Sequence, residues 1–510
     1  MLAKVASSAV IGLDGYIVEV EVDIGYGLPN TAVVGLPDTA VQESRERVKA
    51  AIKNSGLVFP AKKIVINLAP ADIRKEGPAY DLPIAVGILA ASEQLVPDHL
   101  NKFVILGELS LDGTVRAVNS VLPYTIAAKN NGYFKIIVPV ENEQEASLVD
   151  GVQVYSVQNL LEAVQILTDP GNKKPLQFDS SIMESNDENY NIDFNEVKGQ
   201  AYAKRALEIC AAGNHNILMI GPPGSGKTML ARRLPTILPD LTFNEAIEVT
   251  KIYSISGLLP NKKGLITIRP FRSPHHSISN AGLVGGTSIP KPGEISLAHH
   301  GVLFLDELLE FRREVLEVLR QPLEDRVVTI ARAQISITYP ANFMLVASLN
   351  PCPCGHRGDM VKPCICTPYQ VERYWTKLSG PLLDRIDLHL EVPRLTQDEL
   401  IQYPTGEVSK QIRQRVITVR KKQLERFKGT DITSNAEMRP KHIKEFCGLN
   451  EESKDFLRKA INQLNLSARA YDRILKVSRT IADMEEGKNI EISHIAEAIQ
   501  YRTLDRQKII

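Results

Sequence analysis

The feature that most constrains the fold of this chain is a glycine-rich segment that begins at Gly221. It follows a short apolar strand predicted over residues 216–220, and a helix is predicted from Lys227 onward. Glycines let the backbone bend so that successive N–H groups point at phosphate oxygens. In such a loop the lysine reaches the outer phosphates and the hydroxyl of Thr228 ligates Mg²⁺. The pattern is G-x-x-x-x-G-K-[ST], and the segment reads Gly221-Pro222-Pro223-Gly224-Ser225-Gly226-Lys227-Thr228.

Two acidic residues follow a second apolar strand, predicted over residues 301–305. Because parallel α/β sheets bind ligands at the carboxyl ends of their strands, we expect these acids near the glycine-rich loop. Asp306 is predicted to hold Mg²⁺, and Glu307 to orient and polarise an attacking water. A third strand, over residues 342–348, leads to Asn350, whose amide can position that water or contact the γ-phosphate. An ordinary strand-ending asparagine is the alternative reading of Asn350.

The composition is that of a soluble protein with several domains. The length of 510 residues suggests about three domains, and a hydrophobic content of 44% excludes a disordered chain. Six cysteines are too few for a disulfide scaffold of this size. No apolar run reaches the roughly 18 residues that span a bilayer, and the first residues form no signal peptide. We therefore expect a cytoplasmic protein.

The formal net charge of zero conceals an asymmetry along the chain. Residues 1–170 carry 13 basic and 20 acidic side chains, residues 171–195 carry 2 and 5, and residues 196–510 carry 45 and 35. An acidic head before a basic body favours a polyanionic partner for the body alone. The alternative is that the densest basic stretch, from Lys410 to Lys428, is a solvated helix face.

Changes of pattern predict a multidomain α/β protein. Residues 1–167 alternate strand-like and helix-like segments, and residues 168–193 are rich in Asp, Asn, Ser, Gly and Lys, as exposed linkers are. Residues 194–393 hold the apolar strands of a nucleotide-binding core with a parallel sheet. Residues 394–510 become almost wholly helical. The strands predicted in the first domain cover residues 16–22, 63–68 and 136–139.

Four of the six cysteines form a cluster of two C-x-C pairs with His356 between them. In a reducing compartment this set favours structural Zn²⁺ over disulfide bonds. A single intervening residue is tighter than the usual C-x₂₋₄-C spacing, so free thiols and a redox or iron–sulfur site stay as alternatives. The four residues are Cys352, Cys354, Cys364 and Cys366.

Three longer motifs cover residues 269–276, 292–299 and 350–355, which read RPFRSPHH, PGEISLAH and NPCPCG. Together with the glycine-rich loop and the two acids, they resemble AAA+ ATPases of the branch that includes the magnesium-chelatase motor subunit and the MCM helicases. More specifically, they resemble the magnesium-chelatase-like family that contains the competence protein ComM. The resemblance spans almost the whole chain. It implies an AAA+ P-loop core that binds ATP and Mg²⁺, followed by a C-terminal helical lid.

The resemblance also implies a homo-oligomeric ring, usually a hexamer, with ATP at the subunit interfaces. A neighbouring subunit then supplies an arginine finger to the transition state. Residues 378–387 resemble the stretch that bears this finger, which makes Arg385 the candidate. The alternative is a salt bridge to Asp384 or Asp387 within its own subunit. A second arginine is expected to act in cis from the lid. Arg469 fits that place best, and Arg473, four residues on and on the same helix face, is its rival.

Two motifs lie in the N-terminal domain, over residues 75–79 and 106–113, which read KEGPA and LGELSLDG. With them the domain resembles the Lon-protease fold, which is ribosomal S5 domain 2-like. That family uses a serine nucleophile activated by a lysine of depressed pKa. The serine position is Ala79 in this chain, and the lysine position falls near Leu122. Neither side chain can perform the step, so we expect no peptidase activity and a role in ring assembly or partner binding.

The resemblance implies an ATP-dependent DNA motor of the helicase or branch-migration type, acting in natural transformation and homologous recombination. Its partner is expected to be single-stranded or branched DNA. Residues 253–292 and a hairpin over residues 327–337 are expected to face the pore. Arg332, near the hairpin tip, is a candidate phosphate contact, and ordinary hairpin surface is the alternative. Two other functions stay open: a metal-insertion motor like magnesium chelatase, and a platform in which ATP only closes the ring.

Overall fold

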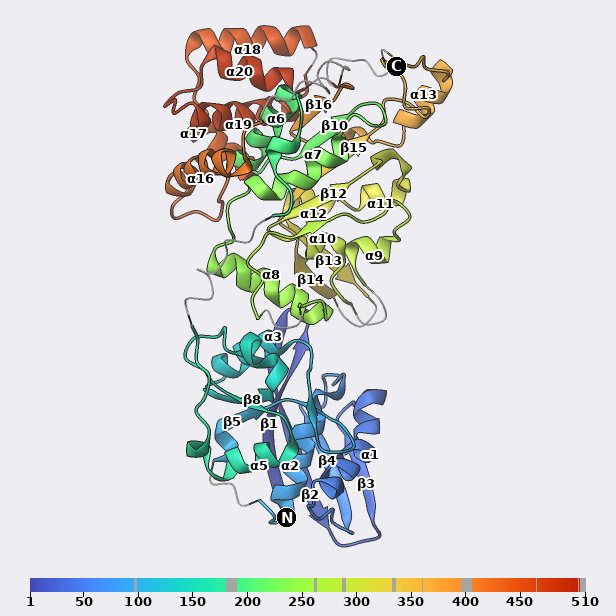
Figure 1. Ribbon diagram of the computed structural model, residues 1–510, viewed down its shortest axis with the longest axis vertical. Coiled ribbons are helices and arrows are strands. Elements are labelled where there is room, and N and C mark those ends of the chain that lie inside the picture. Colours follow the sequence, from blue (N-terminus) through green and yellow to red (C-terminus); the bar gives the residue numbers. More distant parts are fainter. Residues whose placement is uncertain are drawn as a thin grey trace. The chain divides into compact units, whose positions relative to one another are not determined.

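A computed structural model of the chain describes residues 1–95, 99–179, 190–260, 264–286, 290–332, 336–359, 361–395, 406–464, 466–502 and 504. Its contacts divide the chain into two compact units (Figure 1). The first unit consists of Met1–Asn186 with Thr242–Thr267, and the second of Asp187–Leu241 with Ile268–Ile510. Within the described residues, no helix is both long and apolar enough to cross a membrane.

The first unit is built on a mixed seven-stranded sheet in the order β3-β4-β2-β1-β5-β8-β9. The β1–β2 and β2–β4 pairs are antiparallel, and the β1–β5, β3–β4, β5–β8 and β8–β9 pairs are parallel. The three predicted strands correspond to β2, β4 and β8. The strand bounds are β1 Leu2–Ile11, β2 Asp14–Gly25, β3 Asn30–Val34, β4 Lys63–Ala69, β5 Phe103–Ile105, β8 Lys135–Pro139 and β9 Gln153–Val157. A separate small ribbon joins β6 Glu108–Leu109 to β7 Val115–Arg116.

Helix α2, Asp81–Ala91, is the centre of the first unit's core, since every one of its residues is buried. Its Gly87 lets the helix approach β2, because a Cβ there would lie 2.6 Å from a methyl carbon of Val22. The buried carboxylate of Asp81 is held by the guanidinium of Arg47 on α1, with Nε 2.7 Å from Oδ2. The other helices are α1 Thr39–Asn54, α3 Val121–Asn130, α4 Glu143–Ala146 and α5 Leu160–Thr168.

One helix from the middle of the chain also belongs to the first unit. Helix α8, Phe243–Ser256, begins with a capping box between Thr242 and Glu245 and ends at Gly257, which has a positive φ of 69°. The hydroxyl of Ser254 on α8 donates a hydrogen bond to the buried carboxylate of Glu145 on α4. The segment that follows the glycine-rich loop and its helix therefore packs with residues far from it in the sequence. The predicted domain boundaries at 167, 193 and 393 remain predictions.

The second unit contains a five-stranded sheet in the order β11-β12-β15-β10-β16, in which every neighbouring pair is parallel. This sheet confirms the predicted parallel α/β core. Three of its strands, β10, β12 and β15, are buried along their whole length, and their residues are apolar except for Ser348 of β15. The strands are β10 Ile217–Ile220, β11 Phe271–Arg272, β12 Val302–Leu305, β15 Met344–Leu349 and β16 Leu388–Glu391. The predicted hairpin is present as the antiparallel pair β13 Val327–Ala331 and β14 Ser336–Pro340.

The C-terminal region is helical, as predicted, and shares one hydrophobic core with the sheet. Ile217 and Met219 of β10 belong to the same buried cluster as Ile474 and Ile481 of α19. The helices of this region are α16 Ser409–Arg426, α17 Pro440–Phe446, α18 Glu451–Leu464, α19 Ala468–Met484 and α20 Ile492–Gln500. Those before it in the second unit are α6 Ala201–Gly213, α7 Lys227–Arg233, α9 Asn280–Val284, α10 Glu294–Leu297, α11 Arg313–Glu317, α12 Arg320–Asp325, α13 Pro368–Trp375 and α14 Gly380–Leu383.

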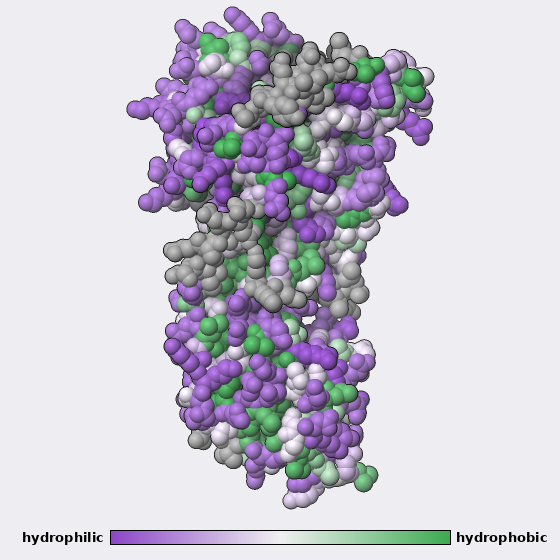
Figure 2. All heavy atoms as spheres, in the orientation of Figure 1, coloured by the Kyte–Doolittle hydropathy of each residue, from purple (hydrophilic) through white to green (hydrophobic). Residues whose placement is uncertain are grey.

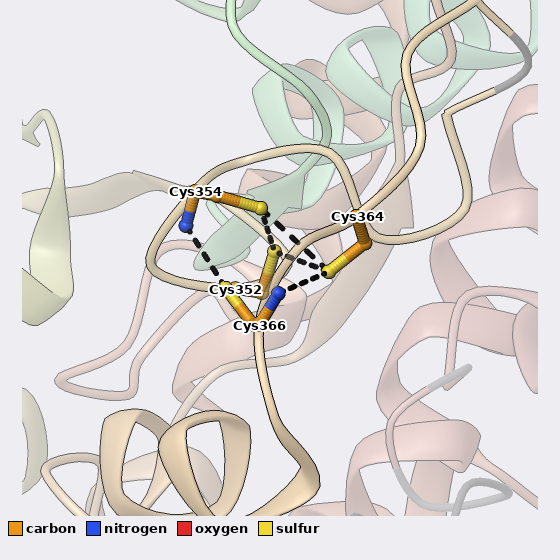
Figure 3. A group of neighbouring side chains, drawn as sticks. All are labelled: Cys352, Cys354, Cys364 and Cys366. Carbon is orange, nitrogen blue, oxygen red and sulfur yellow. Dashed lines mark hydrogen bonds between the residues drawn. The ribbon is translucent and has the colours of Figure 1, made fainter.

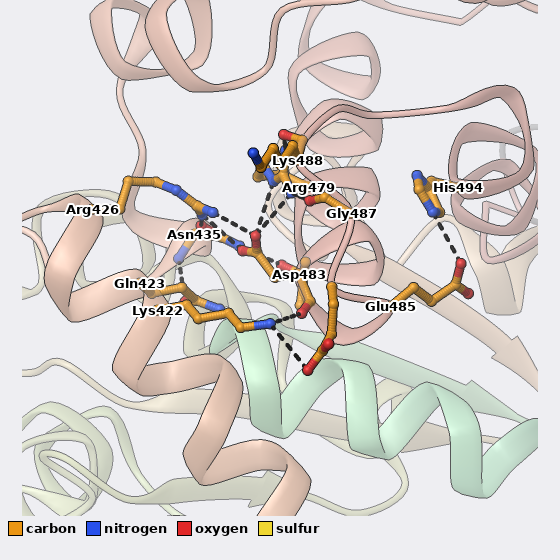
Figure 4. Close-up of polar contacts among 12 residues, drawn as sticks. Lys422, Gln423, Arg426, Asn435, Arg479, Asp483, Glu485, Gly487, Lys488 and His494 are labelled. Atoms are coloured by element: carbon orange, nitrogen blue, oxygen red, sulfur yellow. Dashed lines mark hydrogen bonds and ion pairs between the residues drawn. The ribbon is translucent and has the colours of Figure 1, made fainter.

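A buried polar cluster ties α16 to α19 (Figure 4). The carboxylate of Asp483 accepts hydrogen bonds from Arg426 at 2.7 Å, from Arg479 at 3.1 Å and from the amide of Asn435 at 2.9 Å. A buried carboxylate with several charged donors is stable in place, whereas removal of one donor leaves a desolvated charge. On the face shown in Figure 2, hydrophobic residues occur as small separate patches among hydrophilic ones.

Candidate nucleotide site

The glycine-rich loop joins the end of β10 to the start of α7. Two of its glycines have positive φ, 77° at Gly224 and 90° at Gly226, a backbone conformation that other residues adopt only with strain. At the start of the loop, a Cβ on Gly221 would lie 2.1 Å from the carbonyl oxygen of Val392, which follows β16. The glycines are therefore required both for the turn and for its close packing against the sheet, as the motif predicts.

The amine of Lys227 lies under this loop. It donates hydrogen bonds to the carbonyl oxygens of Gly221 at 2.6 Å and Pro222 at 3.0 Å. It also lies 3.4 Å from the side-chain oxygen of Asn350, which brings the predicted asparagine into the site. Burial lowers the pKa of Lys227, and the carboxylates of Asp306 and Glu307 act in the opposite direction. A buried ammonium held by carbonyl oxygens is a strong donor for phosphate oxygens.

Asp306 lies beside the first turn of α7. Its Oδ2 accepts a hydrogen bond of 2.7 Å from the hydroxyl of Thr228, and its other oxygen accepts one from Ser348. Hydroxyl and carboxylate oxygens are the ligands that Mg²⁺ prefers in phosphate-binding sites. The two residues predicted to hold the ion are therefore adjacent, and their chemistry fits it.

Glu307 is exposed and has a left-handed backbone with a φ of 54°. Its N–H lies 3.1 Å from Oδ1 of Asp306 and 3.4 Å from the hydroxyl of Ser348. Its carboxylate lies 3.6 Å from Nδ1 of His276. A non-glycine residue in this conformation carries roughly 1–3 kcal/mol of backbone strain and is often functional. The turn directs this carboxylate away from the buried strand and into solvent beside Asp306.

Three residues at the site were not predicted. Ser348 lies on β15 two positions before Asn350, which directly follows the strand, so an extended chain places both side chains on the same side. This spacing is a sequence signal for Ser348. His276 lies within the motif of residues 269–276. Gln200, whose amide donates a 2.6 Å hydrogen bond to the carbonyl oxygen of Ser225, has no such signal because it lies far upstream of the loop.

The two candidate arginines lie in different surroundings. Arg385, just after α14, forms an ion pair with Glu324 on α12 and donates to the carbonyl oxygen of Pro381 at 2.7 Å. Within the described residues, the alternative partners Asp384 and Asp387 therefore form no ion pair with Arg385. Arg469 has a 60% exposed side chain whose only recorded ion pair, within the described residues, is a 3.5 Å contact with Asp384.

Arg473, the alternative candidate to Arg469, forms a buried ion pair. Its Nη1 lies 2.8 Å from the carboxylate of Asp387, which is 1% exposed. Burial acts to raise the pKa of Asp387, but the charge of Arg473 and a hydrogen bond from His215 outweigh it and hold that pKa far below its ordinary value. Arg473 therefore stabilises a buried carboxylate, whereas Arg469 is accessible.

The four clustered cysteines lie together in the loop between β15 and α13. Figure 3 shows their side chains converging from both halves of this loop. The sulfur of Cys352 lies 3.4 Å from that of Cys354 and 3.6 Å from that of Cys364, so the thiols are free. All four sulfurs lie within 4.8 Å of one another. The predicted cluster is therefore formed in space; its metal stays a prediction.

The strand order, the glycine-rich loop and the acid at its side define the class of this protein: it contains a P-loop nucleotide-binding core of the AAA+ type. Family comparisons agree with this. Three family descriptions match in succession: "Subunit ChlI of Mg-chelatase" over residues 20–142, "Magnesium chelatase, subunit ChlI" over 193–400, and "Magnesium chelatase, subunit ChlI C-terminal" over 406–502.

The chain is 47% identical to competence protein ComM of Haemophilus influenzae, over 99% of this chain and 98% of that protein. It is 45% identical to YifB of Escherichia coli over the same shares. A stretch of 139 residues is 30% identical to Lon protease 2 of Bacillus subtilis, over 27% of this chain and 25% of that protein. The chain therefore belongs to the magnesium-chelatase-like AAA+ family that includes ComM and YifB, and it contains a Lon-like domain in addition to the AAA+ domain. The family indicates an ATPase that uses ATP and Mg²⁺.

Proposed function

We propose that this protein is an ATP-driven motor that acts on DNA, as a helicase or branch-migration enzyme in natural transformation and homologous recombination. The observation that carries the ATPase part is the contact of Thr228 with Asp306 beside the amine of Lys227. The DNA part is supported by the excess of basic residues in the body, residues 196–510. It is also supported by similarity over the full length to a protein named for competence.

In this proposal each site residue has one task. The loop N–H groups and the Lys227 amine bind the outer phosphates of ATP. The Thr228 hydroxyl and the Asp306 carboxylate hold Mg²⁺, which supplies positive charge to the phosphate oxygens when bound. Asn350 positions the attacking water. The oxygen of the water bonds to the γ-phosphorus while the bond between that phosphorus and ADP breaks. Glu307 accepts the proton that the water loses.

The ring is the second element of the proposal. Six copies of the chain would place Arg385 of one subunit at the ATP of the next, where its charge stabilises the transition state. In that arrangement Arg385 leaves Glu324, its partner in the isolated chain. Arg469 is the proposed cis-acting arginine of the lid. Its side chain is exposed at the start of α19 and its contact with Asp384 is long, so it can turn toward a nucleotide.

The hairpin β13–β14 is the proposed DNA-contacting element. Arg332 follows β13, and its guanidinium lies 3.5 Å from the carbonyl oxygen of Gly286. That hydrogen bond leaves further donors for a phosphate. Contacts between arginines and phosphates are insensitive to base sequence and weaken as salt rises.

The N-terminal domain is proposed to support assembly or partner binding and not proteolysis. Ala79 is buried, and Leu122 on α3 is buried completely. A methyl group cannot attack a carbonyl, and a leucine cannot accept a proton, so the serine–lysine chemistry of Lon is missing at both matched positions.

The ATPase rate, measured while forked or four-way DNA is added, tests the whole proposal. Stimulation by DNA that falls with rising salt supports the motor. Metal insertion into a porphyrin, with no response to DNA, would instead support the chelatase-like function that the family descriptions suggest. Nucleotide binding without hydrolysis under any of these conditions would support a platform that ATP only closes.

A further inference from the structure

The sulfurs of the four clustered cysteines are spaced as the ligands of one tetrahedral metal ion. A Zn–S bond of about 2.3 Å places the sulfurs of a tetrahedral site about 3.8 Å apart. The recorded separations are 3.4 Å for Cys352–Cys354, 3.6 Å for Cys352–Cys364 and 3.6 Å for Cys354–Cys364. These are far longer than the roughly 2.05 Å of a disulfide bond. All-sulfur tetrahedral sets are typical of Zn²⁺ and of iron–sulfur centres.

Backbone donors point at these sulfurs. The N–H of Cys354 lies 3.4 Å from the sulfur of Cys366, and the N–H of Cys366 lies 3.4 Å from the sulfur of Cys364. Such N–H···S bonds support the negative charge of thiolates that ligate a metal. Cys352 is fully buried, so one side of the cluster is closed to solvent.

We propose that the four cysteines bind one Zn²⁺. This metal closes a loop of residues 351–367 (the cysteine loop), which packs against the glycine-rich loop and stabilises its conformation. The contact is made by Gly355. Its φ is +80°, and a Cβ on it would lie 2.7 Å from Cδ and 2.8 Å from Cγ of Pro223. The cysteine loop thus rests directly on the loop that is proposed to hold the phosphates, and this inference depends on that assignment.

The same loop is continuous with the site asparagine. Asn350 precedes the first residue of the cysteine loop, and its side-chain oxygen lies 3.4 Å from the Lys227 amine. The indole N–H of Trp375 donates to the carbonyl oxygen of Pro351 at 3.1 Å. The metal therefore holds together the segment that positions both Asn350 and Gly355, the residue that contacts Pro223.

A second anchor holds the far half of the cysteine loop. The carboxylate of Asp359 lies 3.0 Å from Nδ1 of His356 and 3.2 Å from the guanidinium of Arg394, which follows β16. The loop is thus continuous with β15 at its start and held beside the end of β16 at its middle. A metal that joins Cys352 and Cys354 to Cys364 and Cys366 ties the two halves of the loop together and reduces their remaining freedom. Metal binding and ordering of such a loop are coupled, so loss of the ion frees Gly355 from Pro223.

Elemental analysis of the full chain, purified without added metal or chelator, tests the ion. We expect about one zinc per chain, and loss of zinc in the double variant Cys364→Ser/Cys366→Ser. The matched control is Cys210→Ala, on α6 and outside the cluster, which should keep the zinc. Folded protein without metal and with four titratable thiols in the cluster would overturn the proposal, and so would iron in place of zinc.

Two glycine variants test the contact between the cysteine loop and the glycine-rich loop. Gly355→Ala and Gly358→Ala place a Cβ at nearly the same positive φ, +80° and +77°. Only the first meets Pro223, because no atom of the described residues lies within 4 Å of the second. We expect Gly355→Ala to weaken binding of a fluorescent ATP analogue about tenfold relative to Gly358→Ala, with zinc retained in both. Equal affinities would overturn the coupling. Wild-type protein that holds zinc but binds no nucleotide would overturn the proposed function and leave the metal site standing.

Discussion

The hydroxyl of Thr228 donates a 2.7 Å hydrogen bond to Oδ2 of Asp306, although 78 positions separate the two residues in the chain. The contact forms because β10 and β12 lie on either side of β15 and end at the same edge of one parallel sheet. The glycine-rich loop begins directly after β10, and Asp306 is the first residue after β12. Two motifs that are separate in the sequence thereby become one candidate Mg²⁺ site.

Thr228→Val should remove the Mg²⁺ dependence of nucleotide binding. Valine has nearly the shape of threonine but no oxygen to ligate the ion, so we expect ATP affinity in the presence of Mg²⁺ to fall about 100-fold. Thr228→Ser, which keeps the hydroxyl, should bind nearly as well as the wild type. Titration with a fluorescent ATP analogue, with and without Mg²⁺, measures both. An unchanged Mg²⁺ response in the valine variant would remove Thr228 from the ion.

Glu307→Gln should keep ATP bound and stop its turnover. The amide preserves the size of the side chain but cannot accept the proton of water, so we expect kcat to fall at least about 100-fold at unchanged nucleotide affinity. Glu310→Gln is the matched control, because Glu310 is an exposed carboxylate in the next turn and should leave the rate unchanged. A rate for Glu307→Gln close to that of the control would assign the proton to another group.

Arg469→Ala should lose ATP turnover, whereas Arg473→Ala should lose stability. The first removes an exposed side chain, so we expect normal thermal stability and a loss of ATP turnover of about 100-fold. The second leaves the buried carboxylate of Asp387 without its main counter-charge, which costs about 3–5 kcal/mol of stability. Thermal unfolding and steady-state ATPase assays on both variants distinguish these roles. Full activity in Arg469→Ala would exclude it as the lid arginine.

Arg385→Ala should be inactive alone but active in mixtures. Lys227→Ala lacks a nucleotide site but keeps the finger, and Arg385→Ala lacks the finger but keeps the site. If Arg385 acts on the ATP of a neighbour, mixed rings contain complete sites, and we expect ATPase activity to return to at least about a tenth of the wild-type rate. The absence of any recovery, in mixtures that light scattering shows to be co-assembled, would place Arg385 in its own subunit.

Lys476 on α19 should make stability depend on alkaline pH. Burial, helped by the charge of Arg473, lowers the pKa of its amine from 10.5 to about 8. Between pH 8 and 10.5 the unfolded chain therefore binds a proton that the folded chain does not, so this residue adds stability as pH rises, on the order of 3 kcal/mol over the window. Below pH 8 the amine is charged in both states, and the cost of burying it is fully present.

Thermal unfolding of Lys476→Met as a function of pH checks this. We expect the variant to be more stable than the wild type at pH 7, and its advantage to shrink toward pH 10. The exposed Lys459→Met on α18 should show no such trend. A constant difference between Lys476→Met and the wild type across this range would contradict the pKa of the amine.

Much of the secondary structure could be predicted because its signals are local. The alternation of residues 16–22 predicts β2, and the unbroken apolar runs before Gly221 and Asp306 predict β10 and β12. Strand β1 and helix α2 were not predicted as elements. Five consecutive buried residues in the middle of β1 remove its alternation, and α2 is buried on every side, so it has no polar face to show a helical period.

The sequence alone determined the chemistry that this protein can perform. The residues that carry this chemistry can be identified in the sequence, because each motif is a short run whose spacing is set by backbone geometry. They are the loop glycines, Lys227, Thr228, Asp306 and the cysteine pairs. Only the tertiary structure decided which of these pieces meet. Contacts such as Ser348 with Asp306, Arg385 with Glu324 and Gly355 with Pro223 join separate segments. Their distances depend on how strands order in a sheet and how loops pack upon it, and no local pattern encodes that order.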